Sequence, residues 1–223
     1  MKTFLEITQQ IAKQPWSIED PDITTIETLL EDSPKLINAT QKANSFIFRT
    51  YDFSFKCRAK IINTIQGQRL YDAPQGNIKE IFCQGNTQEL TYDPYLYKLR
   101  EYEGRPAKYT LDCVDTENKL ILHPTPDAVY NLTARYDTLK TAKRIVDNAY
   151  QEIDNLELDD DVLNVPEQYE DMYLQALYAK TMVYLIIDNT DENYAPYETS
   201  FQEALNVLLK NSSGISGETR FVL

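Results

Sequence analysis

The sequence predicts an α+β fold, in which N-terminal helices and a C-terminal helical hairpin pack with a small antiparallel β-sandwich or partly open barrel, followed by a flexible C-terminal tail. Apolar residues recur every three or four positions over residues 3–49 and again over 166–208, which is typical of amphipathic helices. Between these stretches, residues 56–138 alternate apolar and polar side chains, with turn residues at short intervals, which is typical of short strands.

The first section, residues 1–52, is expected to hold three helices. Thr3 followed by Glu6 is a capping-box pattern, in which each side chain bonds the backbone N–H of the other residue, so a helix begins there. A second helix fits residues 23–31 and a third fits residues 35–49. Each has one apolar face, so the three are expected to pack against other elements.

Residues 53–140 are expected to form six or seven short strands, with one short helix inserted after Asp93 and Pro94. Asp93 can cap a helical turn, and Pro94 suits its first position. Alternation in the first strand places apolar side chains on one face, which is expected to be buried: Cys57, Ala59, Ile61 and Ile65. The opposite face carries cations that are expected to be solvated or to protect a sheet edge: Lys56, Arg58 and Lys60.

Residues 141–165 are rich in carboxylates and are expected to form a mobile acidic loop. Closely spaced carboxylates suit calcium, but the D-x-D-x-D-G pattern with a final Glu is missing, so no metal site is predicted. The carboxylates include Glu152, Asp154, Glu157, Asp159, Asp160 and Asp161.

Residues 166–210 predict a helical hairpin that packs on the N-terminal helices. Its first helix is apolar on two sides and must be covered on both. Either it lies centrally within the subunit, or the sheet covers one side and a neighbouring subunit covers the other. Tyrosine, with an apolar ring and a polar tip, is enriched where subunits meet. The residues of this helix expected at a subunit or portal interface are Tyr169, Tyr173, Leu177, Tyr178 and Tyr184.

Residues 211–223 contain Gly214 and Gly217, which disfavour a helix and predict a flexible tail. An apolar tip on such a tail fits a docking peptide, and a frayed terminus is the alternative. The tail residues expected to dock are Ile215, Arg220, Phe221, Val222 and Leu223.

The composition argues against several classes of function. A formal charge of −13 with no basic run argues against stable binding of nucleic acid, although an acidic channel wall would let DNA pass without sticking. The single histidine, His123, and the lack of nucleophile or phosphate-loop patterns predict no enzyme, no cofactor and no metal. No apolar run is long enough for a membrane span, and three scattered cysteines suit buried thiols in a reducing cytoplasm.

Three ordered fragments of the β section resemble a known family. They read G-Q-x-x-Y-x-x-P from Gly67, G-x-P-x-x-Y from Gly104 and L-x-L-x-P-x-P-D-x-x-Y-x-L from Leu120. Each fragment alone is a weak turn signal, but their order is similar to that of the head-to-tail adaptor proteins of short-tailed bacteriophages. The resemblance covers roughly residues 34–210.

The resemblance implies a structural virion protein of the neck, made in the cytoplasm of the host bacterium. It implies a homo-oligomeric ring, expected to be twelvefold, that binds the portal protein, continues the DNA channel and holds the tail or further neck ring proteins. The alternatives are a monomeric β-rich module that binds carbohydrate or protein and, more weakly supported, a hydrolase using two carboxylates. Oligomeric state separates the first two classes.

Overall fold

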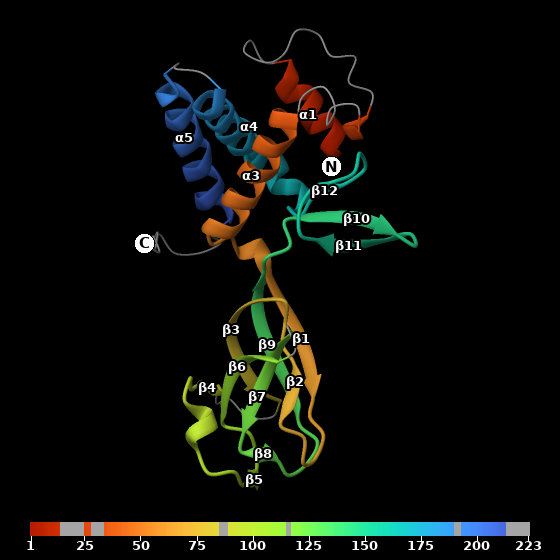
Figure 1. Ribbon diagram of the computed structural model, residues 1–223, viewed down its shortest axis with the longest axis vertical. Coiled ribbons are helices and arrows are strands. Elements are labelled where there is room, and N and C mark those ends of the chain that lie inside the picture. Colours follow the sequence, from red (N-terminus) through yellow and green to blue (C-terminus); the bar gives the residue numbers. More distant parts are fainter. Residues whose placement is uncertain (14–24, 28–33, 85–88, 115–116, 190–192, 213–223) are drawn as a thin grey trace. The chain divides into compact units, whose positions relative to one another are not determined.

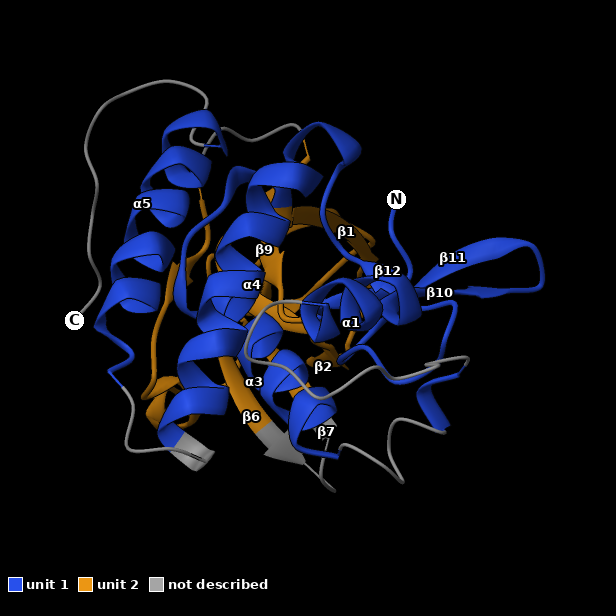
Figure 2. Cartoon of the chain, turned by 90° about the horizontal axis from the view of Figure 1, so that it is seen from above, with its two compact units in different colours: residues 1–55, 140–223 blue, residues 56–139 orange. Residues whose placement is uncertain are grey.

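The structure is a computed structural model that describes residues 1–13, 25–27, 34–84, 89–114, 117–189 and 193–212. It confirms the α+β class, with about 40% helix and 31% strand, and the described strands close no barrel (Figure 1). The chain divides into two compact units (Figure 2). Unit 1 comprises residues 1–55 and 140–223, and unit 2 comprises residues 56–139.

The described helices of unit 1 pack in a row. They are α1 (Phe4–Ala12), α3 (Pro34–Thr50), α4 (Glu167–Asn189) and α5 (Ala195–Ser212). Helix α5 packs on α4, α4 packs on α3, and α3 packs on α1. The predicted capping box is present at the start of α1, because Thr3 Oγ1 accepts the backbone N–H of Glu6 and Glu6 Oε2 accepts that of Thr3. The helix expected over residues 23–31 lies mostly outside the described residues.

Helix α4 takes the first of the two arrangements that its sequence allowed, a central position. It packs between α3 and α5, so both of its apolar sides are covered by the chain's own helices. The shared core includes Ala43 and Ile47 from α3, Tyr173, Leu174 and Leu177 from α4, and Phe201 and Leu205 from α5.

The segment expected to be a mobile acidic loop instead contains a β-hairpin, which corrects that expectation. Strands β10 (Ala142–Val146) and β11 (Ala149–Ile153) pair antiparallel, and β12 (Val162–Leu163) pairs with the other edge of β10. Asp147 and Asn148 form the two-residue turn, with φ of 51° and 62°. Asn and Asp tolerate this left-handed region better than most residues, which is why they form tight hairpin turns.

The carboxylates after the hairpin are ordered because one of them is buried on a cation. We call residues 154–163 the acidic segment. Asp161, with a side chain that is 0% exposed, accepts bonds from Arg144 Nε at 2.7 Å and Arg144 Nη2 at 2.8 Å. It also accepts the backbone N–H groups of Glu157 and Leu158, both at 2.7 Å. Burial alone would raise the pKa of Asp161, but the bonds from Arg144 and these two N–H groups outweigh it, so the pKa is lowered.

The acidic segment also holds the N-terminal helices. The backbone N–H of Phe4 donates to Asp161 O at 2.7 Å, and that of Ile26 donates to Asp159 Oδ1 at 2.6 Å. Gln41 of α3 donates through Nε2 to Leu156 O at 2.6 Å. The β10–β11 hairpin, α1 and α3 therefore all contact the acidic segment.

Unit 2 contains two main sheets that share one apolar core. The first has the order β1 (Cys57–Asn63), β9 (Asn131–Thr138), β3 (Gly76–Cys83). The second has the order β2 (Leu70–Asp72), β7 (Glu117–His123), β6 (Lys108–Val114), β4 (Thr91–Tyr92). A small pair joins β5 (Glu103–Gly104) to β8 (Thr125–Pro126), and the inserted helix is one 3₁₀ turn, η2 (Leu96–Lys98). The core includes Ile62, Ile81, Leu120, Leu122 and Leu132.

The face predicted to be buried in the first strand is wrong. Ile61 is 69% exposed and Ile65 is 58% exposed, whereas Ile62 is buried. The face that carries Lys60 is the inner one, because it also carries the buried Ile62, and Lys56 just before the strand is only 3% exposed. The Lys60 ammonium donates to the backbone carbonyl of Asp72 at 3.1 Å. A long lysine stem can lie against an apolar core while its charged end reaches a polar partner.

Replacing the buried carboxylate should destabilise unit 1. In Asp161→Asn, an amide would face N–H donors and Arg144 would lose its bidentate partner, so we expect a loss of about 3–5 kcal/mol. Hydrogen exchange of the most protected amides in unit 1 measures this without interference from unit 2. The control is Asp154→Asn, since Asp154 is 71% exposed in its pair with Lys140. That exposed pair should contribute no more than about 1 kcal/mol. Equal effects of both variants would contradict the role assigned to Asp161.

The same carboxylate should make unit 1 sensitive to acid. A carboxyl whose pKa is lower in the folded chain stabilises the fold above its unfolded pKa, about 3.9, and loses that contribution as pH falls through the folded pKa. The free energy of unfolding of unit 1 should therefore fall more steeply below about pH 4 in the wild type than in Asp161→Asn. Glu198, with a pKa that is also lowered, acts in the same direction in both proteins, so the difference between the two pH profiles isolates Asp161. Parallel profiles would refute this assignment.

Candidate functional site

Two of the residues proposed for an interface lie in the core of unit 1. Tyr173 and Leu177 are both 0% exposed. The Tyr173 hydroxyl donates to Asn44 Oδ1 at 2.8 Å, and burial raises the pKa of this tyrosine well above its usual value. From these positions neither side chain can touch another subunit, so their role is to hold α4 against α3 and α5.

The other three residues proposed on α4 keep part of their surface exposed. Tyr169, Tyr178 and Tyr184 are half-buried. The Tyr178 hydroxyl donates to Gln10 Oε1 at 2.7 Å. Its burial, with the charges of Glu170 and Asp171, raises the pKa of Tyr178 to about 12, so the hydroxyl stays protonated at neutral pH. As interface residues these three remain a prediction.

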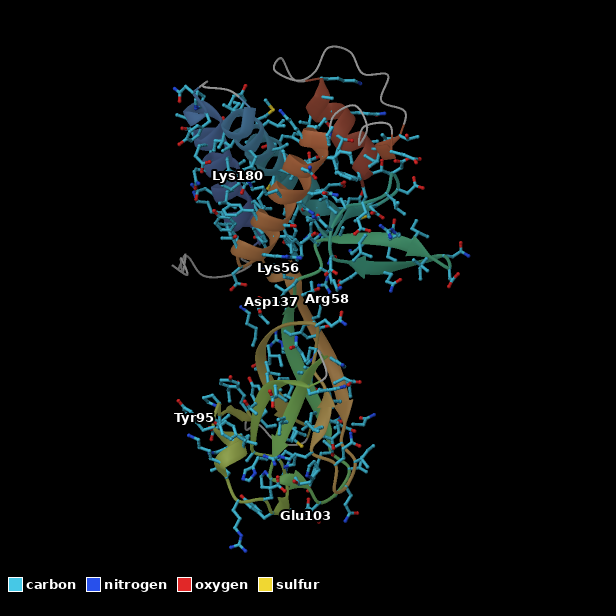
Figure 3. All side chains as sticks on the ribbon, viewed as in Figure 1. Lys56, Arg58, Tyr95, Glu103, Asp137 and Lys180 are labelled. Atoms are coloured by element: carbon cyan, nitrogen blue, oxygen red, sulfur yellow. The ribbon has the colours of Figure 1, made fainter. Side chains whose placement is uncertain are left out.

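A buried lysine joins three helices of unit 1 (Figure 3). The Lys180 ammonium pairs with Glu198 at 3.0 Å and lies 4.7 Å from the ring centre of Phe201 and 4.9 Å from that of Phe46. Burial alone would raise the pKa of Glu198, but hydrogen bonds from Gln202 and Lys180 lower it overall. Since all these partners belong to α3, α4 and α5, Lys180 stabilises the helical packing and is not a site for a ligand.

The proposed tail anchors lie outside the described residues. They are Ile215, Arg220, Phe221, Val222 and Leu223.

The structure shows an exposed aromatic surface that the sequence reasoning had not singled out. Residues 92–102, the tyrosine loop, carry four tyrosines that are each at least half exposed: Tyr92 at 52%, Tyr95 at 60%, Tyr97 at 66% and Tyr102 at 58%. The Lys98 ammonium lies 4.7 Å from the ring centre of Tyr95 and 5.7 Å from that of Tyr97. Four tyrosines within eleven residues are a signal that the sequence itself contains. The sequence does not show whether their rings are exposed, because that depends on tertiary packing.

The tyrosine loop is held by polar contacts at its base. Asp93 Oδ1 accepts the backbone N–H of Tyr95 at 3.0 Å, and Asp93 Oδ2 accepts the Lys108 ammonium at 3.0 Å. The bond from Lys108, followed by that from Tyr95, lowers the pKa of Asp93. The loop that carries Tyr95 (Figure 3) is therefore ordered at its base, as expected of aromatic anchors at a protein interface.

His123 has a packing role in unit 2. It is 5% exposed, and the edge of its ring meets Tyr102 at 5.0 Å between ring centres. Burial, followed by the nearby cations Arg69 and Lys108, lowers the pKa of His123, so the ring is neutral at pH 7. The described residues bring no three or more His, Cys, Asp or Glu side chains together in a way that could hold a metal ion. Within the same residues, no helix is long and apolar enough to span a membrane.

Comparison with known protein families gives one match. The family model described as SU10 adaptor protein matches residues 2–220. No curated protein matches the chain.

Truncating a side chain should lower stability strongly at a core position and change it little at an exposed position. Leu177→Ala removes buried atoms between α3 and α5 and should destabilise unit 1 by about 2–5 kcal/mol. Tyr97→Ala removes an exposed ring and should change stability by no more than about 0.5 kcal/mol. Hydrogen exchange of each unit measures both. If the Leu177→Ala protein keeps its stability but does not form the ring expected of this chain, Leu177 is an interface residue and the core role assigned to it is wrong.

Proposed function

Since the chain belongs to the SU10 adaptor protein family, a family of phage head-to-tail adaptors, we propose that it forms a ring below the portal that continues the DNA channel and holds the tail. An adaptor of this family is a virion protein and associates with portal and tail proteins. The ring, its expected twelvefold symmetry and its position on the portal are the proposal.

The observation that carries this function is the extent of the family match. It covers residues 2–220 of 223, so it includes both compact units and not only the β section. A match confined to the β section would also have suited a free-standing binding module.

The exposed aromatic side chains supply candidate contacts. A ring built from identical subunits needs two different surfaces on each, and a neck ring needs further surfaces for its partners above and below. We assign the tyrosine loop to a protein partner, portal or tail, because large exposed rings on an ordered loop suit such an interface. Tyr169, Tyr178 and Tyr184 remain proposed contacts of unit 1, and the tail residues 215–223 remain a proposed docking peptide.

The acidic composition fits a channel that DNA passes through. With a formal charge of −13, the subunit repels the phosphate backbone, so DNA would move through the ring without specific binding. In unit 2, the Lys60 ammonium on the first strand donates to the backbone carbonyls of Asp72 and Ala73, so it is engaged within its own chain.

One alternative function is favoured by a specific observation. Exposed tyrosine rings can also stack on sugars, so the tyrosine loop fits a monomeric carbohydrate-binding module as well. A carbohydrate-binding module of this kind is not expected to bind a portal ring.

Mixing the protein with purified portal rings tests the proposal. We expect mass photometry and electron microscopy to show portal rings capped by a second ring, with twelve adaptor copies. A monomer in isolation is compatible with assembly templated by the portal. A protein that stays monomeric with the portal present would refute the proposed function, and binding to a glycan array in that case would favour the alternative.

A further inference from the structure

We infer that the β10–β11 hairpin is an intersubunit arm whose distal half docks on helix α5 of a neighbouring copy of this chain. The inference rests on the proposed ring and deepens it by naming one pair of surfaces through which the copies meet. Both surfaces belong to unit 1.

The distal half of the hairpin, residues 145–151, is exposed although apolar side chains dominate it. Ile145 and Tyr150 are each 57% exposed, and Val146 is 41% exposed. Ile145 and Tyr150 are directly opposite each other across the two strands, so they form one apolar pair on the same face. The described part of unit 1 leaves more than half of this pair exposed, and covering it would remove apolar surface from water.

Strand β11 is also an open sheet edge. In the described part of the chain it pairs only with β10, and its register contains no bulge. Its sequence, Ala-Tyr-Gln-Glu-Ile, has neither Lys nor Pro, the residues that commonly protect an edge. Covering an edge with a helix is another means of protection, and α5 of a second copy would provide it.

The base of the hairpin is fixed, which favours docking of the distal half. Arg144 in β10 is held by Asp161 through two bonds of 2.7 and 2.8 Å. Thr141, just before β10, donates to the backbone carbonyl of Asp154 at 2.8 Å. A preorganised arm loses little conformational entropy when it binds.

The hairpin and α5 lie on opposite flanks of unit 1. Helices α4, α3 and α1 lie between them in the row of packed helices (Figures 1 and 2). Two different surfaces on opposite flanks are what a heterologous contact needs in order to repeat around a ring. The arm of one copy would reach the α5 of the next.

Charge does not oppose a second copy as the occupant, because both surfaces carry few exposed charges. The chain has a formal charge of −13, so copies repel one another wherever acidic faces meet. The distal half of the hairpin carries one carboxylate, Asp147, and the exposed charges of α5 are one acid, Glu203, and one base, Lys210. These two surfaces can therefore meet without net repulsion, and Val207, 49% exposed, gives α5 an apolar contact point.

Photo-crosslinking from residue 150, in the distal half of the hairpin, tests this inference. The full chain carries Tyr150→p-benzoylphenylalanine, and equal amounts of ¹⁵N-labelled and unlabelled protein are assembled on purified portal rings before irradiation. We expect mixed-label crosslinks from residue 150 to peptides within residues 195–212. In parallel, Ile145→Ser combined with Tyr150→Ser should raise the protein concentration needed to fill the portal ring about tenfold or more. The matched control is Val129→Ser, which changes a side chain that is 70% exposed in unit 2 and should leave that concentration unchanged.

Each result decides the inference. Crosslinks that reach only the portal, only the same copy or another element of the neighbour overturn it and leave the proposed function standing, as does an assembled ring without crosslinks. If the wild type does not assemble on the portal, the proposed function fails, and the labelled mixture is irradiated at high concentration without portal. A mixed-label crosslink to α5 then still supports the arm, and its absence overturns it.

Discussion

Unit 1 depends on the burial of one carboxylate. Removing Asp161 from water is unfavourable unless every lone pair finds a partner, and the bidentate Arg144 with two backbone N–H groups provides those partners. The Asp161–Arg144 pair also affects the packing of other elements. Since the same short segment accepts bonds from α1 and α3, the position of Asp161 fixes where the N-terminal helices and the hairpin meet. The ion pair therefore fixes an arrangement of elements as well as stabilising unit 1.

That arrangement decides which aromatic residues remain available to partners. A helix that is apolar on two sides is covered first by neighbours in its own chain, because they are present at far higher effective concentration than another subunit. Helix α4 is enclosed in this way by α3 and α5, which removes Tyr173 and Leu177 from any interface. Two ordered segments, the tyrosine loop and the distal half of the hairpin, are among the places where apolar or aromatic side chains stay exposed in the described part of the chain.

Local signals in the sequence predicted the parts of the fold that are determined locally. The capping box at Thr3 and the helical periodicity over residues 35–49 and 166–208 follow from spacing alone, and helices α1, α3, α4 and α5 confirm them. The first strand was misassigned because the adjacent residues Ile61 and Ile62 offer an apolar side chain to either face, and a shift by one residue reverses the faces. The acidic segment was misread because its order comes from Arg144, outside the run of acids, through a pairing that composition does not reveal. The tyrosine loop was visible in the sequence, but exposure depends on tertiary packing.

A formal charge of −13 opposes the assembly of this chain with copies of itself, because like charges repel. In the proposed ring, the charge that would keep DNA from binding would also drive neighbouring subunits apart, and salt screens such repulsion only beyond roughly 8–10 Å. Subunits can still meet closely if contact is confined to surfaces where charge is sparse and apolar area is high. In unit 1 the distal hairpin has both properties, and Asp161 holds it at its base. The Asp161–Arg144 pair, whose opposite charges cancel, therefore positions the surface that we propose for contact between copies.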